Sequence, residues 1–174
     1  MDYALVLYFD KETESYFNGI IDSIASSGVS NYMVENNVVP HITIAAFYTE
    51  DIGSVVPVID NNISHFVAGN VVWASIGSFV PRVLFAAPVM NEYLLNACVN
   101  MNRLVKPLAH CSYDHYLPYQ WVPHTTLASN LESDSLRGAF NIAMQKFSAI
   151  AGKCVKLSLI QCNPIKEVKA WDLV

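Results

Sequence analysis

A four-residue pattern, Pro-His-x-Thr, occurs twice in this chain, and the two copies are separated by about half of its 174 residues. The copies are Pro40-His41-Ile42-Thr43 and Pro123-His124-Thr125-Thr126, and an aliphatic residue and an alanine follow each one. A match of this length predicts two local structures of the same kind. We therefore expect a weak internal symmetry, in which two similar lobes each contribute one copy to a shared cleft.

Strand geometry predicts which side chains of each copy face that cleft. Successive side chains of a β-strand point to opposite faces, so His41 and Thr43 share one face, as do His124 and Thr126. The residues between and after them then pack into the core and hold the strand rigid. By the same alternation Phe47 lies on the face of His41, and we predict that it stacks on a base of the ligand.

Two imidazoles and two hydroxyls in matched settings indicate acid–base chemistry on a phosphate. A histidine titrates near pH 6.5 when unperturbed, so one ring of a pair can be neutral while the other is charged. One histidine then accepts a proton while the other donates one. The alternative is that each copy is only a strand with an incidental histidine, but the repetition favours the functional interpretation.

Length and composition indicate one domain that spans residues 1–174. The chain is 53% hydrophobic and 14% charged, which is typical of a globular protein and excludes a disordered one. No segment approaches the roughly 18 uninterrupted apolar residues of a membrane span. The start, Met1-Asp2-Tyr3, lacks the positive charge of a signal peptide. We therefore expect a cytoplasmic protein, without a membrane partner, that acts as a monomer.

The net charge and the cysteines limit the kinds of ligand and partner that the chain is expected to bind. The net charge is −5 and the ten basic residues are scattered, so long nucleic-acid duplexes are poor partners, whereas a small nucleotide or an RNA end needs only local complementarity. The four cysteines show no CxxC spacing and are expected to be reduced thiols. A zinc cluster of His110, Cys111 and His115 lacks a fourth ligand and any recognised spacing. We expect neither a metal nor a cofactor.

The distribution of apolar residues predicts mixed secondary structure. Seven segments, rich in β-branched and aromatic residues, are predicted as strands: 4–9, 38–48, 71–80, 82–89, 121–128, 156–162 and 168–174. Four segments with apolar residues at spacings of three and four are predicted as helices: 11–27, 51–68, 91–108 and 133–150. We expect Gly28 and Gly152 to end helices, a loop over 110–119 and a turn at Asn163-Pro164.

The segments His41-Ile42-Thr43-Ile44 and His124-Thr125-Thr126-Leu127 resemble the paired HxTx motifs of the two-histidine (2H) phosphoesterase superfamily. This superfamily includes bacterial proteins named for 2′-5′ RNA ligase and cyclic phosphodiesterases. The resemblance extends to the separation of the motifs, the opening strand and helix, and the segment 78–89. It implies a bilobal α+β fold with two antiparallel sheets and flanking helices around a central cleft, with pseudo-twofold internal symmetry.

The resemblance also implies an activity and a role for each motif residue. It implies metal-independent opening of 2′,3′-cyclic or related phosphodiesters, or the reverse 2′-5′ ligation. His41 and His124 would be the acid–base pair, and Thr43 and Thr126 would bind the phosphate oxygens. The sequence alone does not assign which histidine is the base.

The chain departs from the family pattern after the first motif. Some members carry an arginine there, whereas Ala45 and Ala46 follow Ile44 in this chain. A missing phosphate-binding cation motivates a second hypothesis, a nucleotide-binding module that keeps the cleft and performs little chemistry. A purely structural protein is a third hypothesis, and it accounts least well for the repeated motif.

Overall fold

The structure is a computed structural model that describes residues 2–111 and 114–174. It has the α+β composition expected from the sequence, with its strands paired antiparallel in the order β5-β2-β1-β7-β3-β4-β6 and β8 paired to β7. The strands are β1 (Asp2–Phe9), β2 (His41–Tyr48), β3 (Gly69–Phe79), β4 (Val83–Pro88), β5 (His110–Cys111), β6 (Thr125–Ala128), β7 (Ile150–Cys162) and β8 (Ile165–Asp172).

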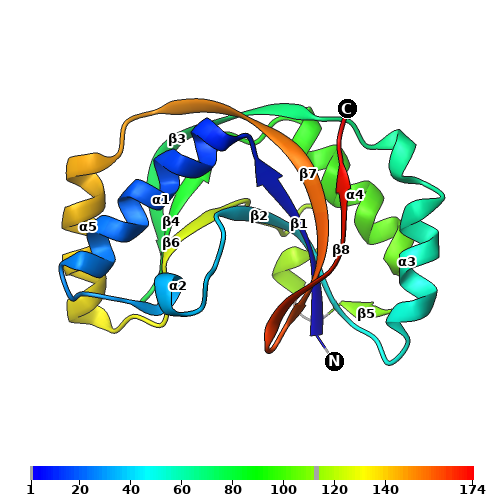
Figure 1. The fold of residues 1–174 in the computed structure, drawn as a ribbon, viewed down its shortest axis with the longest axis horizontal. Helices are drawn as coiled ribbons and strands as arrows, with labels where there is room; N and C mark the ends of the chain where they lie inside the picture. The colour runs from blue at the N-terminus through cyan, green and yellow to red at the C-terminus, as the bar shows by residue number, and fades with distance from the viewer. Residues whose placement is uncertain (1, 112–113) are drawn as a thin grey trace.

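Helices cover the two ends of this sheet (Figure 1). They are α1 (Lys11–Ser26), α2 (Tyr32–Glu35), α3 (Ile52–Asp60), α4 (Glu92–Val105) and α5 (Ser133–Lys146), with short 3₁₀ helices η1 (Ile63–His65) and η2 (Asp114–Tyr116). Side-chain caps define the starts of the long helices: Asp10 accepts a hydrogen bond from the Thr13 amide, and Asn91 accepts one from the Leu94 amide, each at 2.9 Å. None of the described helices is long and apolar enough to cross a membrane.

The strands form one continuous sheet, where two separate sheets were expected. The first part of β3 (69–73) pairs with β7, and the rest (73–79) pairs with β4. One long strand therefore serves both ends of the molecule, and the sheet arches so that β2 and β6 approach each other beneath it (Figure 1). Cα atoms of β2 and β6 lie within 8 Å of each other, although four strands separate them in the pairing order. The bilobal description and the twofold internal symmetry stay predictions.

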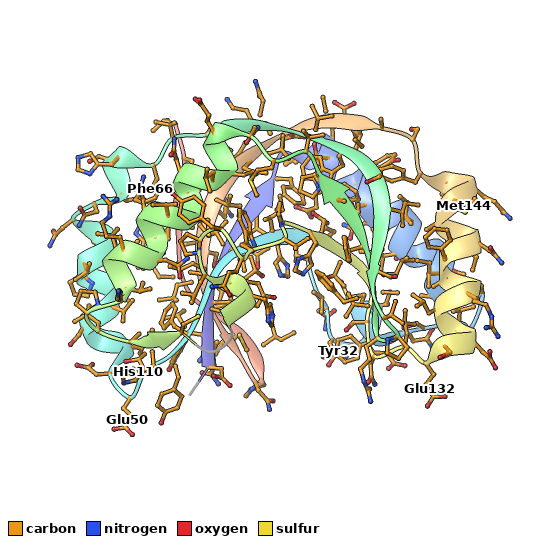
Figure 2. All side chains as sticks on the ribbon, turned by 180° about the vertical axis from the view of Figure 1, so that it is seen from behind. Tyr32, Glu50, Phe66, His110, Glu132 and Met144 are labelled. Atoms are coloured by element: carbon orange, nitrogen blue, oxygen red, sulfur yellow. The ribbon has the colours of Figure 1, made fainter. Side chains whose placement is uncertain are left out.

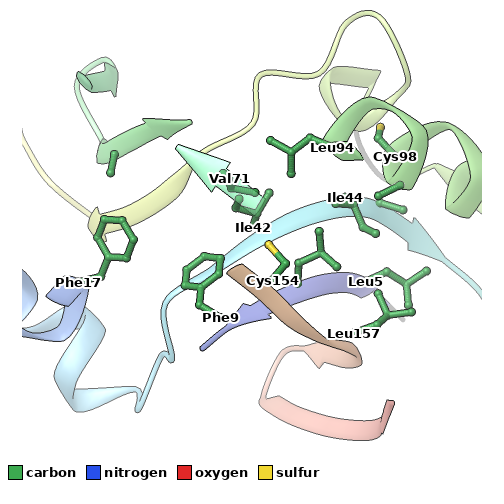
Figure 3. Close-up of a cluster of buried hydrophobic side chains, with 14 of the residues drawn as sticks. Leu5, Phe9, Phe17, Ile42, Ile44, Val71, Leu94, Cys98, Cys154 and Leu157 are labelled. Carbon is green, nitrogen blue, oxygen red and sulfur yellow. The ribbon is translucent and has the colours of Figure 1, made fainter. Parts of the chain in front are cut away.

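A single large apolar cluster fills the space between the sheet and the helices. Aromatic rings form its centre at one end, where Trp73 lies with its ring centroid 4.9 Å from that of Phe9 and 5.1 Å from that of Phe17. Ile42 and Ile44 of the first motif are fully buried in the same cluster (Figure 3). This burial agrees with the alternation expected for the motif and fixes β2 against the core.

Several predicted boundaries were wrong. The helix expected over 51–68 ends at Asp60, and η1 follows it. The helix expected over 133–150 ends at Lys146, because Phe147 is already extended (φ −78°, ψ 131°). Gly152 lies within β7, where a Cβ atom would lie 2.0 Å from the Thr13 hydroxyl oxygen, so this glycine permits a close approach of β7 to α1.

The second motif strand is also shorter than expected. A strand was predicted over 121–128, whereas β6 begins at Thr125, so His124 lies immediately before the strand. Pro123 precedes it and cannot donate a ladder hydrogen bond, which accounts for the late start. Residues 112 and 113 of the loop predicted over 110–119 lie outside the described residues.

Candidate active site

The imidazoles of His41 and His124 are held in the same way. The Nδ1 atom of His41 lies 2.7 Å from the carbonyl oxygen of Val39, and that of His124 lies 2.9 Å from the carbonyl oxygen of Val122. A carbonyl only accepts, so Nδ1 carries the proton in both rings, and in a neutral ring Nε2 keeps its lone pair. Among the described residues, neither Nε2 atom has a hydrogen-bond partner. Both rings are therefore oriented by the backbone two residues earlier and leave the same nitrogen for a ligand.

The strands that follow the histidines share an irregularity at the same place. The β1–β2 register pairs Val6 with Thr43 and then Leu5 with Ala45, so Ile44 is an extra residue. The β4–β6 register likewise pairs Phe85 with Thr126 and then Leu84 with Ala128, which leaves Leu127 extra. Both motifs thus carry a β-bulge directly after the threonine, and bulges of this kind re-aim the side chains beside them.

This bulge overturns the prediction for Phe47. The extra residue inverts the alternation beyond it, so Phe47 turns into the core instead of toward the face of His41. Its side chain is 1% exposed and stacks on Tyr3 with ring centroids 6.1 Å apart. A base cannot stack on a ring that is buried in this way, so no stacking role is assigned to Phe47.

The two motif threonines have side chains available for a ligand. Thr43 and Thr126 are partly buried, as are His41 and His124, whereas the residues between and after them are buried. No group within residues 2–111 and 114–174 is hydrogen-bonded to either hydroxyl. Thr125, in contrast, faces the core and accepts a hydrogen bond of 3.0 Å from the indole Nε1 of Trp73. The pattern of exposure predicted for the motifs is therefore present in both copies.

Burial and mutual charge set the protonation of the two histidines. Burial lowers the pKa of His41, against an opposing effect of its hydrogen bond to Val39. Burial also lowers the pKa of His124, and the charges of His41 and His115 lower it further. The strands that begin at His41 and directly after His124 approach each other, with Cα atoms of β2 and β6 within 8 Å. Both imidazoles are biased toward the neutral form in the absence of a ligand, and an anion between them would restore the charge on one ring.

Aromatic rings surround the two histidines unequally. His124 lies between Phe79, Phe85 and Tyr116, with ring centroids 4.9, 5.4 and 6.4 Å from its own. Within residues 2–111 and 114–174, the one aromatic neighbour of His41 is Tyr8, which meets it edge-on with ring centroids 6.1 Å apart. Burial, followed by the charges of Glu167 and Glu14, raises the pKa of the Tyr8 hydroxyl. The hydroxyl therefore stays protonated near neutral pH and can act as a hydrogen-bond donor.

Sequence reasoning missed Tyr8 and Tyr116 as neighbours of the site. Tyr8 reaches His41 through the pairing of β1 with β2, where the two residues are directly opposite. Tyr116 reaches His124 from η2, in a segment expected only to be a loop. A predicted β1–β2 register would have identified Tyr8, but no local signal in the chain points to Tyr116.

A pocket of about 630 Å³ lies on the side of the second motif. His124 and Thr126 line it, together with Phe79, Tyr116 and His115. A larger pocket of about 710 Å³ lies elsewhere, between the end of α4, the end of β2 and the segment before β6, and contains none of the four motif residues. We assign the second half of the candidate site to the smaller pocket, because His124 and Thr126 line it, whereas His41 and Thr43 are not among its lining residues.

The possible metal ligands and the four cysteines of the chain are considered next to the motif residues. No group of three or more His, Cys, Asp or Glu side chains in the described part of the chain is arranged to hold a metal ion. Cys98 and Cys154 are buried thiols, and Cys111 and Cys162 are exposed. Burial raises the pKa of Cys98 to about 11 and that of Cys154 to about 12, so neither is a thiolate near neutral pH.

Solved structures of other proteins share the fold of this chain, although its sequence matches no known family. No protein-family model and no curated protein matches the chain by sequence. Solved structures match nearly its whole length. E. coli LigT complexed with 3′-AMP has a TM-score of 0.58 at 11% identity, covering 99% of this chain and 97% of LigT. TT0787 of Thermus thermophilus has a TM-score of 0.65 at 12% identity, covering 99% of this chain and 98% of that protein.

A viral domain shares the same architecture. The MHV ns2 PDE domain matches with a TM-score of 0.51 at 14% identity, covering 97% of this chain and 99% of that domain. The chain therefore has the fold of E. coli LigT, TT0787 and the MHV ns2 PDE domain, in agreement with the fold that the resemblance of its motifs implied. At these identities the likeness concerns the fold, and the chemistry has to be argued from the site.

Proposed function

We propose that this protein is a metal-independent phosphodiesterase that opens cyclic phosphodiesters of the 2′,3′-cyclic nucleotide or RNA-end type. The supporting observation is the matched pair of motifs: both rings bond a carbonyl through Nδ1, and both leave Nε2 to a ligand. Catalysis of this kind needs one neutral and one protonated imidazole on opposite sides of a phosphorus atom.

The proposed reaction uses each group once. One histidine, neutral at Nε2, accepts a proton from water as the water oxygen forms a bond to phosphorus. The other, protonated at Nε2, donates its proton to the ribose oxygen as the ester bond to phosphorus breaks. The product is a nucleotide with an opened phosphate monoester. When a ribose hydroxyl of an RNA end replaces water as the nucleophile, the same ring opening forms a 2′-5′ phosphodiester, which is ligation, and the reverse of that step cleaves the diester and closes the cyclic phosphate. The hydroxyls of Thr43 and Thr126 donate to the phosphate oxygens, where charge accumulates in the transition state.

The pocket beside the second motif suits a small nucleotide. Its volume of about 630 Å³ is within the range of small-molecule sites, and aromatic and apolar side chains form much of its lining. E. coli LigT, which has the same fold, has been solved with 3′-AMP, with ATP and with NADP+. These ligands share a nucleotide, and their binding to a LigT-like fold supports a nucleotide or an RNA end as the substrate class.

Turnover of 2′,3′-cyclic nucleotides in the presence of a chelator tests this proposal. We expect the purified protein to be active, and we expect His41→Ala and His124→Ala each to lose about 10²–10⁴-fold in kcat/KM. His65, an exposed histidine of η1, supplies a matched control, because His65→Ala should keep full activity. Undiminished turnover in either motif variant would refute the assignment.

A second candidate is a nucleotide-binding module with little catalysis. Ala45 and Ala46, which stand where related motifs carry an arginine, are 1% and 7% exposed, so the site has no cation at this position. Calorimetry with nucleoside monophosphates, combined with a panel of cyclic substrates, separates the two candidates. Binding without turnover would favour the module.

We further propose that the protein is a single domain, that it acts as a monomer and that it is located in the cytoplasm. Size-exclusion chromatography with light scattering measures the oligomeric state directly, and one cooperative unfolding transition is expected for one domain.

A further inference from the structure

The side chain of Asn102 links three segments of the molecule. It lies on α4, and its amide nitrogen Nδ2 is 3.1 Å from the carbonyl oxygen of Ile44 and 3.3 Å from that of Tyr116. It also lies 2.9 Å from the carbonyl oxygen of Cys98, one turn earlier in its own helix. An amide nitrogen has two hydrogens, so these acceptors share them. One side chain thus bonds the strand of the first motif and the segment that contacts the second histidine.

The bond to Ile44 reaches a residue that has no opposite residue in the sheet. Ile44 is the extra residue of the bulge after Thr43, so it has no opposite residue on β1. On the outer edge of β2, β5 pairs only with Phe47 and Tyr48. Ile44 is fully buried, and a buried carbonyl needs a donor from elsewhere. Asn102 supplies that donor directly behind the threonine that is proposed to bind phosphate.

The bond to Tyr116 acts on the other half of the site. Tyr116 ends η2, its ring lies 6.4 Å from that of His124, and it lines the pocket that contains His124 and Thr126. η2 is short and is not part of the sheet, so hydrogen bonds to its backbone help to fix its place. A shift of this segment would open the pocket and expose the imidazole of His124 to water.

We propose that Asn102 is a positioning residue that holds the bulge behind Thr43 and the Tyr116 segment at a fixed separation across the site. This inference rests on the proposed function for its kinetic consequence. Asn102 does not touch the reacting atoms. Its effect passes through Thr43 on one side and through the surroundings of His124 on the other.

Two substitutions remove the bond in different ways. Asn102→Ala deletes both donors and removes the bonds to the carbonyls of Ile44 and Tyr116, the second of which also accepts from the Cys98 thiol at 3.9 Å. Asn102→Asp places a carboxylate, which only accepts, against the same carbonyl oxygens. Asn100, an exposed asparagine of the same helix, provides the matched controls Asn100→Ala and Asn100→Asp.

Kinetics give the first measurement. We expect Asn102→Ala to lower kcat by about 10- to 100-fold with a much smaller change in KM, because a small displacement of positioned groups acts mainly on the transition state. We expect Asn102→Asp to be worse at neutral pH and to recover partly at acid pH, where a protonated carboxyl donates again. Both Asn100 controls should retain wild-type values. Circular dichroism checks that each variant is folded.

Histidine titration by NMR gives a second measurement that needs no substrate. In Asn102→Ala we expect the pKa of His124 to rise toward its ordinary value as the Tyr116 segment loosens. The pKa of His41 should not change. The charged groups that act on His124 are His41 and His115, and the substitution changes neither.

The two measurements separate failure of this inference from failure of the proposed function. A wild-type protein without turnover would refute the proposed function, yet the titration would still decide whether Asn102 positions the segment beside His124. Wild-type kcat in Asn102→Ala with an unchanged His124 titration would overturn the inference. An equal change in both histidines would also overturn it, because that result indicates general loosening.

Discussion

The two histidine motifs share a backbone design but differ in their surroundings. Both carry the same bond from Nδ1 to the carbonyl two residues earlier and the same bulge after the threonine. His124, however, is enclosed by three aromatic rings and lines a pocket, whereas His41 has a single aromatic neighbour in the described part of the chain, Tyr8 on the adjoining strand.

This difference separates chemistry from specificity. The shared parts are those that a phosphate with two similar faces requires, namely an imidazole and a hydroxyl on each side. The two motifs differ in the side chains that surround the histidines. Such side chains line the binding pocket and select the group that is attached to the phosphate. We therefore expect the nucleoside to occupy the side of His124, and the two motifs to respond alike to loss of a catalytic group and differently to changes of substrate.

The largest effect should come from the two histidines, and a change of leaving group should separate their roles. His41→Ala and His124→Ala should each lose about 10²–10⁴-fold in kcat/KM on a 2′,3′-cyclic nucleotide. A nitrophenyl phosphodiester has a leaving group that needs no proton, so the variant that lacks the acid should regain most of its activity on it. The variant that lacks the base should not, and equal recovery of both would contradict separate roles.

A smaller effect is expected from the threonines. Thr43→Val and Thr126→Val keep the shape and remove the hydroxyl, so each loses a hydrogen bond to a charged group, worth about 1.5–3 kcal/mol or roughly 10- to 100-fold in kcat/KM. Serine at either position should restore much of the loss, since it returns the hydroxyl. Steady-state kinetics measure both series, and a valine variant with wild-type activity would remove that threonine from the site.

The pH dependence should reflect the lowered pKa values of both histidines. The free enzyme needs one protonated imidazole, and that form is lost as pH rises through a pKa below 6.5. The optimum of kcat/KM should therefore lie below about pH 6.5, the ordinary value for histidine. A bound phosphodiester anion favours the protonated ring, so the optimum of kcat should lie at higher pH. An optimum of kcat/KM well above 7 would contradict the direction of both shifts.

The smallest effect on activity should come from the buried residue between histidine and threonine, which is Ile42 in one motif and Thr125 in the other. Thr125→Val removes the acceptor of the Trp73 indole and should lower the free energy of unfolding by about 1–3 kcal/mol. Ile42→Val removes one methylene group and should cost about 0.5–1.5 kcal/mol. Denaturant titration measures both, and a large loss of activity without a loss of stability would contradict a core role.

The sequence predicted most of the elements and the exposure of the motif residues, because both depend on local patterns. The opening strand and helix, the strand that carries His41 and the burial of Ile42 and Ile44 follow from periodicity, although that strand was predicted over 38–48 and begins at His41. The prediction for Phe47 was wrong for a physical reason: a bulge shifts the alternation by one residue, and the sequence of β2 alone does not show where β1 pairs with it.

Contacts between distant segments were beyond the reach of the sequence. Tyr8 meets His41 through strand pairing, and Tyr116 meets His124 through the packing of a short 3₁₀ helix. The single sheet was missed as well, since β3 and β7 each pair with different strands along their lengths. Figure 2 shows the same arch from behind, with the side chains drawn on its ribbon.

The long strands β3 and β7 have a consequence for how the molecule works. β3 pairs with β7 over residues 69–73 and with β4 over 73–79, with one irregularity between Trp73 and Ser75, so paired strands and no loop join the two ends of the arch. The spacing of the catalytic groups is then established when the chain folds, before any substrate arrives. For the proposed reaction we therefore expect no closing motion, and a turnover limited by bond breaking or by departure of the product.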